Sequence, residues 1–147
     1  MTVSPASTDI PAPFTLLEPY GPFHELVGPL YETRRNGRIV IGMRVATKHR
    51  NKGPGMHGGM YFMLFDTAMT HASAQVRPEN AIAVTSSFSS ELIGAAAPGD
   101  WIEAEVEVLR TGKRVVFLNT VIRRDGQDGP ALARGSATFQ IVERRAA

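Results

Sequence analysis

The spacing of hydrophobic residues changes along this chain, and the change distinguishes strands from one long helix. Apolar residues recur at every second position of Arg38–Ala46, which is typical of a strand with one buried face. Asn36-Gly37 stands directly before this run, and because Asn-Gly strongly favours a hairpin turn, it predicts a partner strand over Leu30–Arg34. Runs between turn signals predict further strands, over Ala81–Ile93, Trp101–Leu109, Arg114–Arg123 and Ala131–Val142.

Between the two groups of strands lies a segment whose apolar residues do not keep to one face. It follows a polar, glycine- and proline-rich loop over Lys48–Gly55 and predicts a helix from about His57 to Val76. Pro78 ends this helix, because the residue before a proline avoids helical geometry. A helix that is apolar on most sides must be covered on most sides. Two strands, one helix and four strands therefore predict an α+β fold, in which an antiparallel sheet of about six strands wraps around one long central helix.

The chain is predicted to fold as one domain. Its 147 residues can bury a sizeable core, and a composition of 43% hydrophobic and 20% charged residues is ordinary for a globular protein. We expect this domain to cover residues 14–147 and to begin with a short helix or packed loop over Phe14–Val27. Residues 1–13 are small, polar and proline-rich, which predicts a disordered or loosely packed arm.

The composition argues against several classes of function. The chain has no cysteine, so it has no disulfide, thiolate metal site or cysteine nucleophile. No apolar run approaches the roughly 18 residues that span a bilayer, and the N-terminus does not look like a signal peptide, so we expect a cytoplasmic protein with no membrane partner. The formal net charge is +2 and the basic residues are scattered, so we expect no nucleic-acid partner.

One carboxylate, Asp66, interrupts the apolar run of the predicted helix. In helical geometry its neighbours are Phe62, Met63 and Met69. A buried charge is costly unless it is paired, coordinated or used, so burial of Asp66 among these residues would indicate an enzyme site. The alternative is that Asp66 is an ordinary surface residue on the one wet strip of the helix.

The start of the helix carries a second chemical feature, the Gly58-Gly59 pair. Glycines let a ligand or another chain approach the backbone closely, and the first N–H groups of a helix point outward at the positive end of its dipole. Such donors suit an oxyanion or a polarised carbonyl. Asp66 lies about two turns further along, so a two-fold partner could bring its own carboxylate to this loop. His57 could bind, cap the helix or pack, whereas His71 is interpreted as structural because no second metal ligand stands at a useful spacing.

These residues together resemble the signature of a known family. Asn51, five residues, His57-Gly58-Gly59, six residues and Asp66 form a combination that is similar to that of the hotdog-fold acyl-CoA thioesterases. The branch it resembles most is the phenylacetate-degradation type of the thioesterase superfamily, and the resemblance runs from about Gly28 to Val142. It implies hydrolysis of an acyl-CoA thioester without a metal or other cofactor, in a homodimer that often pairs into a homotetramer, with active sites at the protomer boundary.

The resemblance also implies a catalytic role for each matching residue. Asp66 would act as a general base on water or as a nucleophile, and Gly58 would offer its N–H to the thioester carbonyl. Asn51 would hold that end of the substrate or the water. Thr85, on the next strand, would assist the water and the carboxylate.

Several assignments stay open at this stage. Ser86 or Ser87 could replace Thr85, and strand alternation places Ser87 on the face of Thr85. His57 and Gly59 are expected to contact the substrate, and the turn at Lys113-Arg114 resembles one that often meets CoA phosphates. Two other functions are possible: a hotdog-fold enoyl-CoA hydratase or dehydratase, which would pair a catalytic histidine with a carboxylate, and a non-catalytic module that binds acyl-CoA.

Overall fold

Seven strands and one main helix make up the fold. The structure, a computed structural model, describes residues 9–145. The helices are α1 (Pro22–Val27), the 3-10 helix η1 (Thr47–His49) and α2 (Gly58–Ala74). The strands are β1 (Thr15–Leu16), β2 (Tyr31–Arg35), β3 (Arg38–Arg44), β4 (Ala81–Leu92), β5 (Trp101–Thr111), β6 (Val115–Arg124) and β7 (Ala131–Glu143). All pairs are antiparallel, in the order β1-β2-β3-β5-β6-β7-β4.

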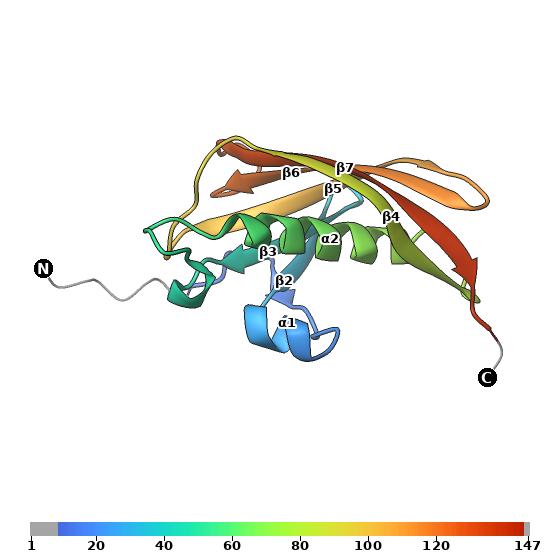
Figure 1. The fold of residues 1–147 in the computed structure, drawn as a ribbon, viewed down its shortest axis with the longest axis horizontal. Helices are drawn as coiled ribbons and strands as arrows, with labels where there is room; N and C mark the ends of the chain where they lie inside the picture. Colours follow the sequence, from blue (N-terminus) through green and yellow to red (C-terminus); the bar gives the residue numbers. More distant parts are fainter. Residues whose placement is uncertain (1–8, 146–147) are drawn as a thin grey trace, which may run out of the picture.

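The sheet curves around α2, as the apolar sequence of this helix predicted (Figure 1). Leu64, Phe65, Ala68 and Met69 are fully buried and belong to one core with inward side chains of the long strands. Gly135 on β7 lies close under two rings, because an added Cβ there would stand 3.3 Å from Phe88 and 3.4 Å from Phe65. The predicted α+β architecture is therefore confirmed.

The six predicted strands are all present, with small changes at their ends. β5 shows why the prediction worked: Ile102 and Ala104 are fully buried on the helix side, while Glu103, Glu105 and Glu107 alternate on the outer face. The seventh strand, β1, was not predicted, because two residues paired with Tyr31 and Glu32 carry no detectable alternation.

The N-terminal segment contributes to two apolar clusters: Leu17 joins the core around α2, and Phe14 joins a smaller cluster with Val40 and Trp101. The predicted short helix is α1, which begins with Pro22 at a position where the missing N–H is not needed. Phe14 packs edge-on against Trp101, with ring centroids 5.0 Å apart. Most of the predicted N-terminal arm, residues 1–8, lies outside the described residues. Neither α1 nor α2 has the length and hydrophobicity to cross a bilayer, and the same holds for every helix within residues 9–145.

The cover over α2 is incomplete. The sheet ends at β4, which has a partner, β7, on one side only. A strip of α2 that includes Phe62 and Asp66 stays exposed next to this edge. This strip is the one side of α2 that the sheet leaves uncovered, and the candidate site lies there.

Candidate active site

The start of α2 is organised by the ring of His57. His57 is the N-cap residue, and its Nδ1 accepts a hydrogen bond from the Gly59 N–H at 2.9 Å. The absent side chain of Gly59 makes room for the ring, since a Cβ there would lie 3.0 Å from Nδ1. Of the three possibilities open for His57, capping is the one observed.

Gly58 presents its backbone to the outside of the helix. A Cβ added to Gly58 would meet one atom within 4 Å, Cδ1 of Leu92, at 3.4 Å. Its N–H is the first of the helix and has no acceptor within α2. The Gly58 N–H is therefore available to a group from outside the helix.

Asp66 is exposed in this chain, contrary to the expectation of burial among apolar neighbours. The reason is its place on the uncovered strip, where the flanking Phe62 is itself 44% exposed. Thr85 Oγ1 on β4 donates a hydrogen bond of 2.7 Å to Asp66 Oδ1. The carboxylate is thus held by β4 but remains accessible, as the alternative surface placement required.

A β-bulge decides which hydroxyl of β4 reaches Asp66. The register of β4 against β7 shifts between Thr85 and Ser87, so that Thr85 pairs with Phe139 and Ser87 with Thr138. Ser86 is the extra residue, and its Oγ bonds to Thr138. The expectation that Ser87 shares the face of Thr85 is wrong, because the bulge reverses the alternation and turns Phe88 toward α2.

The helix keeps the amide donor and the carboxylate of one chain apart. Gly58 and Asp66 are separated by eight positions on α2, which is about 12 Å at 1.5 Å per residue. One chain therefore cannot bring the Gly58 N–H and the Asp66 carboxylate to one carbonyl group.

Asn51 stands at the base of the loop that leads to Gly58. Its N–H donates to the Gly55 carbonyl at 2.9 Å, and an isolated bridge between Arg50 and Met56 closes the loop. Its side chain is exposed. Asn51 therefore lies at the amide half of the candidate site and not at the carboxylate half.

Lys113 and Arg114 lie away from both halves in the same chain. They are exposed in the turn between β5 and β6, at the end of the sheet opposite the start of α2 (Figure 1). The start of α2 is anchored at the other end, where the Met56 N–H donates to the Ala96 carbonyl at 2.7 Å. The structure does not bring this basic turn to Gly58 or Asp66 within one chain.

The structure places His24, from α1, near the carboxylate, and no pattern in the sequence indicated this. His24 Nε2 lies 3.1 Å from Thr67 Oγ1, next to Asp66 in the chain, and its Nδ1 accepts from the Tyr20 N–H at 3.2 Å. Partial burial lowers the pKa of His24, and the negative charge of Asp66 opposes this shift. The N–H of Tyr20 facing Nδ1 is compatible with the neutral ring that carries its proton on Nε2.

His71 belongs to a second hydrogen-bonded group along α2. Its Nδ1 is bonded to the Tyr20 hydroxyl, and its Nε2 lies 3.0 Å from Glu32 Oε2. Burial, with a smaller contribution from the charge of Glu32, raises the pKa of Tyr20. Within residues 9–145, no three histidine or acidic side chains are grouped so that they could hold a metal ion.

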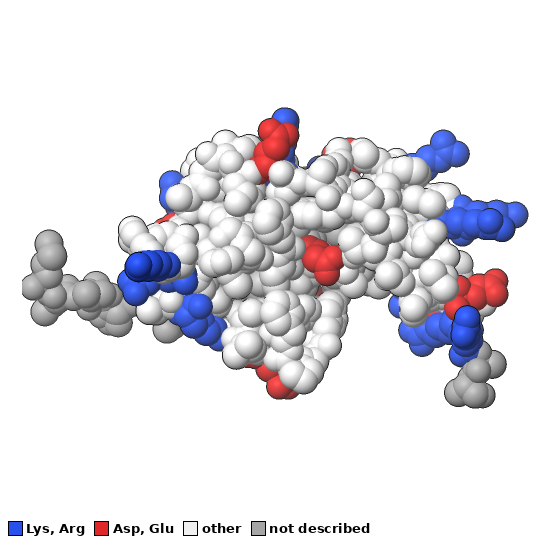
Figure 2. Space-filling model, in the orientation of Figure 1, with Lys and Arg blue, Asp and Glu red and all other residues white. Residues whose placement is uncertain are grey.

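The surface around the uncovered strip is poor in charge. Figure 2 shows a broad, mostly uncharged face with one acidic group near its centre; the other charged groups lie toward its margins, the basic ones mainly at its two ends. Asp66 is the one charged residue of α2. On the edge strand β4, Leu92 lies beside Gly58 and is 45% exposed, while Ile82 and Val84, at 41% and 47%, are exposed on the opposite face of the strand from Thr85.

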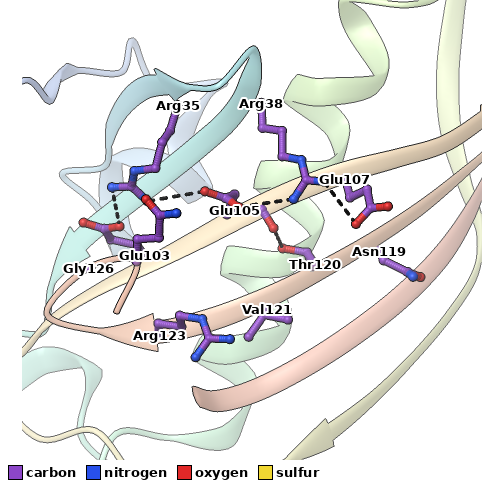
Figure 3. Close-up of a pocket in the computed structure, with 11 residues that line it drawn as sticks. Arg35, Arg38, Glu103, Glu105, Glu107, Asn119, Thr120, Val121, Arg123 and Gly126 are labelled. Atoms are coloured by element: carbon purple, nitrogen blue, oxygen red, sulfur yellow. Dashed lines mark hydrogen bonds and ion pairs between the residues drawn. The ribbon is translucent and has the colours of Figure 1, made fainter. Parts of the chain in front are cut away.

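Apart from the candidate site, a charged cleft lies on the outer face of the sheet. Arg35 and Arg38 reach from the β2–β3 hairpin to Glu103, Glu105 and Glu107 on β5, with nitrogen–oxygen distances of 3.0 to 3.4 Å (Figure 3). Its basic and acidic groups are already paired with one another. Because α2 covers the opposite face, this cleft is separate from Asp66.

This chain has one helix held in a curved antiparallel sheet, with a carboxylate on the helix and two glycines at its start. These are the features of the hotdog-fold thioesterases. The chain belongs to the thioesterase superfamily, whose family profile matches residues 54–131. This confirms the family that the motif from Asn51 to Asp66 indicated.

Individual proteins are similar to this chain in sequence or in fold. The chain is 31% identical over 110 residues to a Pseudomonas aeruginosa protein named "Putative esterase PA0474", covering 74% of this chain and 82% of that protein. Its fold is similar to that of zebrafish thioesterase superfamily member 2, at 25% identity and a TM-score of 0.71, over 81% of this chain and 86% of the other. It is also similar to a mutant of the phenylacetic acid degradation protein PaaI from Thermus thermophilus, at 23% identity and a TM-score of 0.70, over 82% and 98% of the two chains.

Proposed function

We propose that this protein hydrolyses an acyl-CoA thioester to the free acid and CoA. The observation that carries the proposal is the pair formed by Asp66 and Thr85: an accessible carboxylate, held at 2.7 Å by a hydroxyl, on an otherwise uncharged helix. Membership of the thioesterase superfamily supports the reaction class. The residue roles and the acyl-CoA substrate are the parts that experiment must test.

The proposed reaction needs two chains. The Gly58 N–H and Asp66 of one chain are about 12 Å apart along α2, so the amide donor must come from a partner chain. β4 offers a free edge for pairing two copies, and the exposed Ile82 and Val84 would be covered by it. In such a homodimer, which could pair further into a homotetramer, an isologous interface would create two equal sites.

In each site the chemistry is proposed as follows. Water attacks the thioester carbonyl carbon while Asp66 accepts a proton, and the resulting oxyanion is stabilised by the Gly58 N–H of the other chain. The tetrahedral intermediate then breaks its C–S bond and releases CoA as the thiolate. In the alternative path, Asp66 attacks the carbonyl carbon and displaces CoA as the thiolate, and water then hydrolyses the resulting mixed anhydride to the free acid and the Asp66 carboxylate. Neither path requires a metal or redox cofactor, and CoA is part of the substrate and product.

The other matching residues receive supporting roles. Thr85 orients Asp66 and the water, and Asn51 holds the thioester end or the water near Gly58. His57 and Gly59 shape the loop that meets the substrate. Lys113 and Arg114 are proposed to meet the CoA phosphates, which requires CoA to extend along the sheet or to reach the turn of the other chain.

A panel of acyl-CoA esters with a thiol-detecting readout tests the proposal. The wild type should release CoA, and Asp66→Ala should lose this activity while keeping its melting temperature. Retained turnover in Asp66→Ala would remove Asp66 from the proposed role. Tight binding of CoA esters without turnover by the wild type would favour a non-catalytic module.

The same panel, extended to enoyl-CoA hydration, separates the hydratase alternative. A hydratase would need a histidine free to transfer a proton next to a carboxylate. His24 is the histidine near Asp66, but both of its ring nitrogens are engaged, with Tyr20 and Thr67. His57 is occupied at the helix cap by Gly59. Thioester hydrolysis is therefore the better-supported function.

A further inference from the structure

His49 is a buried histidine that the proposed reaction does not use. It ends η1, directly before the glycine-rich loop, and is 3% exposed. The sequence placed it in a polar loop, where burial is not expected. A buried imidazole in a loop must have its polar atoms satisfied, so its partners indicate what it does.

Both ring nitrogens of His49 have backbone partners. Nδ1 accepts from the Ala46 N–H at 2.9 Å, and Nε2 lies 2.6 Å from the Val27 carbonyl oxygen at the end of α1. An N–H facing Nδ1 and a carbonyl facing Nε2 are compatible with one form, the neutral ring with its proton on Nε2. Burial lowers the pKa of His49, and the positive charge of Lys48 lowers it further. The hydrogen bond to the Val27 carbonyl acts in the opposite direction.

The backbone of His49 reaches the amide half of the site. Its carbonyl accepts a hydrogen bond of 2.8 Å from the His57 N–H. The His57 carbonyl in turn accepts from the Met60 N–H at 2.9 Å. Because a peptide unit is planar, fixing the His57 carbonyl also fixes the direction of the Gly58 N–H that belongs to the same unit.

The rest of this loop is held less firmly. Asn51 and the residues after it up to Pro54 are exposed, and the loop is closed at its base by the bridge between Arg50 and Met56. The base is tied to the remainder of the fold by the Met56 bond to Ala96, by the buried Met56 side chain, by the Lys48 Nζ bond to the Leu26 carbonyl and by the ring of His49, which alone among these has two backbone partners. Loss of that ring would leave the His49 carbonyl, and with it His57, free to shift.

We propose that His49 is a positioning residue that aims the Gly58 N–H, by clamping the base of the loop to α1 and to Ala46. This inference rests on the proposed function, in which Gly58 is the oxyanion donor. His49 itself touches neither the substrate nor the reacting atoms. Since a displacement of about 1 Å at a reacting group can cost about a hundredfold in rate, a ring that holds this donor should affect turnover well beyond its effect on folding.

The test compares His49→Leu, His49→Gln and His49→Asn with a matched control, His71→Leu. His71→Leu also removes a partly buried histidine with two partners, but at Tyr20 and Glu32, away from the loop. We expect His49→Leu to lower kcat about tenfold or more with little change in KM. Gln, whose amide can still donate to the Val27 carbonyl, should restore part of the rate, whereas His71→Leu should leave kcat near the wild-type value at a similar loss of melting temperature.

Several outcomes would overturn the inference. One is wild-type kcat in a folded His49→Leu; another is a loss of kcat in His71→Leu as large as that in His49→Leu, which would indicate a general effect of lowered stability. If His49→Leu does not fold, the test rests on the kcat of His49→Gln and His49→Asn. A wild-type kcat in both variants would refute the positioning role.

An amide measurement separates this inference from the proposed function. The ¹⁵N–¹H resonance of Gly58 should move in His49→Gln and stay in place in His71→Leu. If the wild type hydrolyses no thioester, the proposed function fails, and the Gly58 resonance still tests the positioning. An unchanged Gly58 resonance in every His49 variant would refute the positioning even if the enzyme is active.

Discussion

The hydrogen bond between Thr85 and Asp66 makes a quantitative prediction about the proposed site. Replacing Thr85 by Val keeps the β-branched shape, which suits a strand, and removes only the hydroxyl that donates to Asp66 Oδ1 at 2.7 Å. Thr85→Ser is the matched variant that keeps the hydroxyl. The pair of substitutions therefore isolates one hydrogen bond.

The size of the effect follows from the kind of bond. A hydrogen bond to a charged group contributes about 1.5–3 kcal/mol, and exposure of both Thr85 and Asp66 places this one at the lower end. Because about 1.4 kcal/mol corresponds to a factor of ten in rate, Thr85→Val should lower kcat/KM about tenfold if the bond orients Asp66 in the transition state. The free energy of unfolding should fall by no more than about 1.5 kcal/mol, since the bond is exposed and no buried group loses its partner.

The assay is thiol release from the best acyl-CoA of the panel, with melting temperatures measured alongside. The kcat/KM of Thr85→Ser should stay within about threefold of the wild type, because this variant keeps the hydroxyl and a tenfold loss would require about 1.4 kcal/mol. Ser87→Ala is the control on the same strand, because the bulge turns Ser87 to the other face. Wild-type rates in Thr85→Val, or equal losses in Thr85→Val and Ser87→Ala, would show that the Thr85 hydroxyl does not serve the carboxylate.

Three further predictions concern the cap, the pH dependence and the edge strand. Gly59→Ala would place a Cβ 3.0 Å from His57 Nδ1, so loss of the cap should cost about 1 kcal/mol and lower the melting temperature by about 2–4 °C; an unchanged melting curve would contradict this. Burial lowers the pKa of His49 below its ordinary 6.5, so the neutral ring stabilises the fold above pH 6.5 and this contribution is lost as the pH falls through the lowered pKa. Urea unfolding between about pH 7 and 5 should therefore show a steeper loss of stability in the wild type than in His49→Gln, and parallel curves would be inconsistent with a buried neutral ring. Val84→Lys on β4, where Val84 is 47% exposed, should give monomers in sedimentation and abolish turnover without unfolding the chain; an active monomer would contradict the two-chain site.

The sequence predicted most of the architecture because its signals were local. Alternation on β5 and the Asn36-Gly37 turn each specify structure within a few residues, and the apolar run of α2 requires cover from a sheet. β1 was not predicted because a strand of two residues is too short to show an alternation of apolar and polar positions. The arrangement of the site depended on features that alternation does not encode, such as the bulge after Thr85, which an extra residue creates by pairing with β7.

Burial was the least predictable property of the site. Asp66 was expected to be surrounded by apolar groups, but exposure depends on where the sheet ends, and β4 ends it beside this strip. His49 shows the reverse: it stands in a polar stretch, yet α1 folds over it. His24 reaches Thr67 from 43 positions away, and contacts of that range leave no pattern in a single sequence.

The charged cleft on the outer face of the sheet limits how this protein can be redesigned. Glu103 is 5% exposed and is satisfied by Arg35 at 3.0 Å and by the Trp101 indole N–H at 2.9 Å. Removing Arg35 alone would strand an acid that water cannot easily reach, at a cost of about 3–5 kcal/mol, whereas exchanging Glu103, Arg35 and Trp101 together for well-packed hydrocarbon leaves neither an unpaired charge nor a buried indole N–H without its acceptor. This corner of the sheet can therefore be rebuilt in a single concerted exchange, but not through single-residue steps.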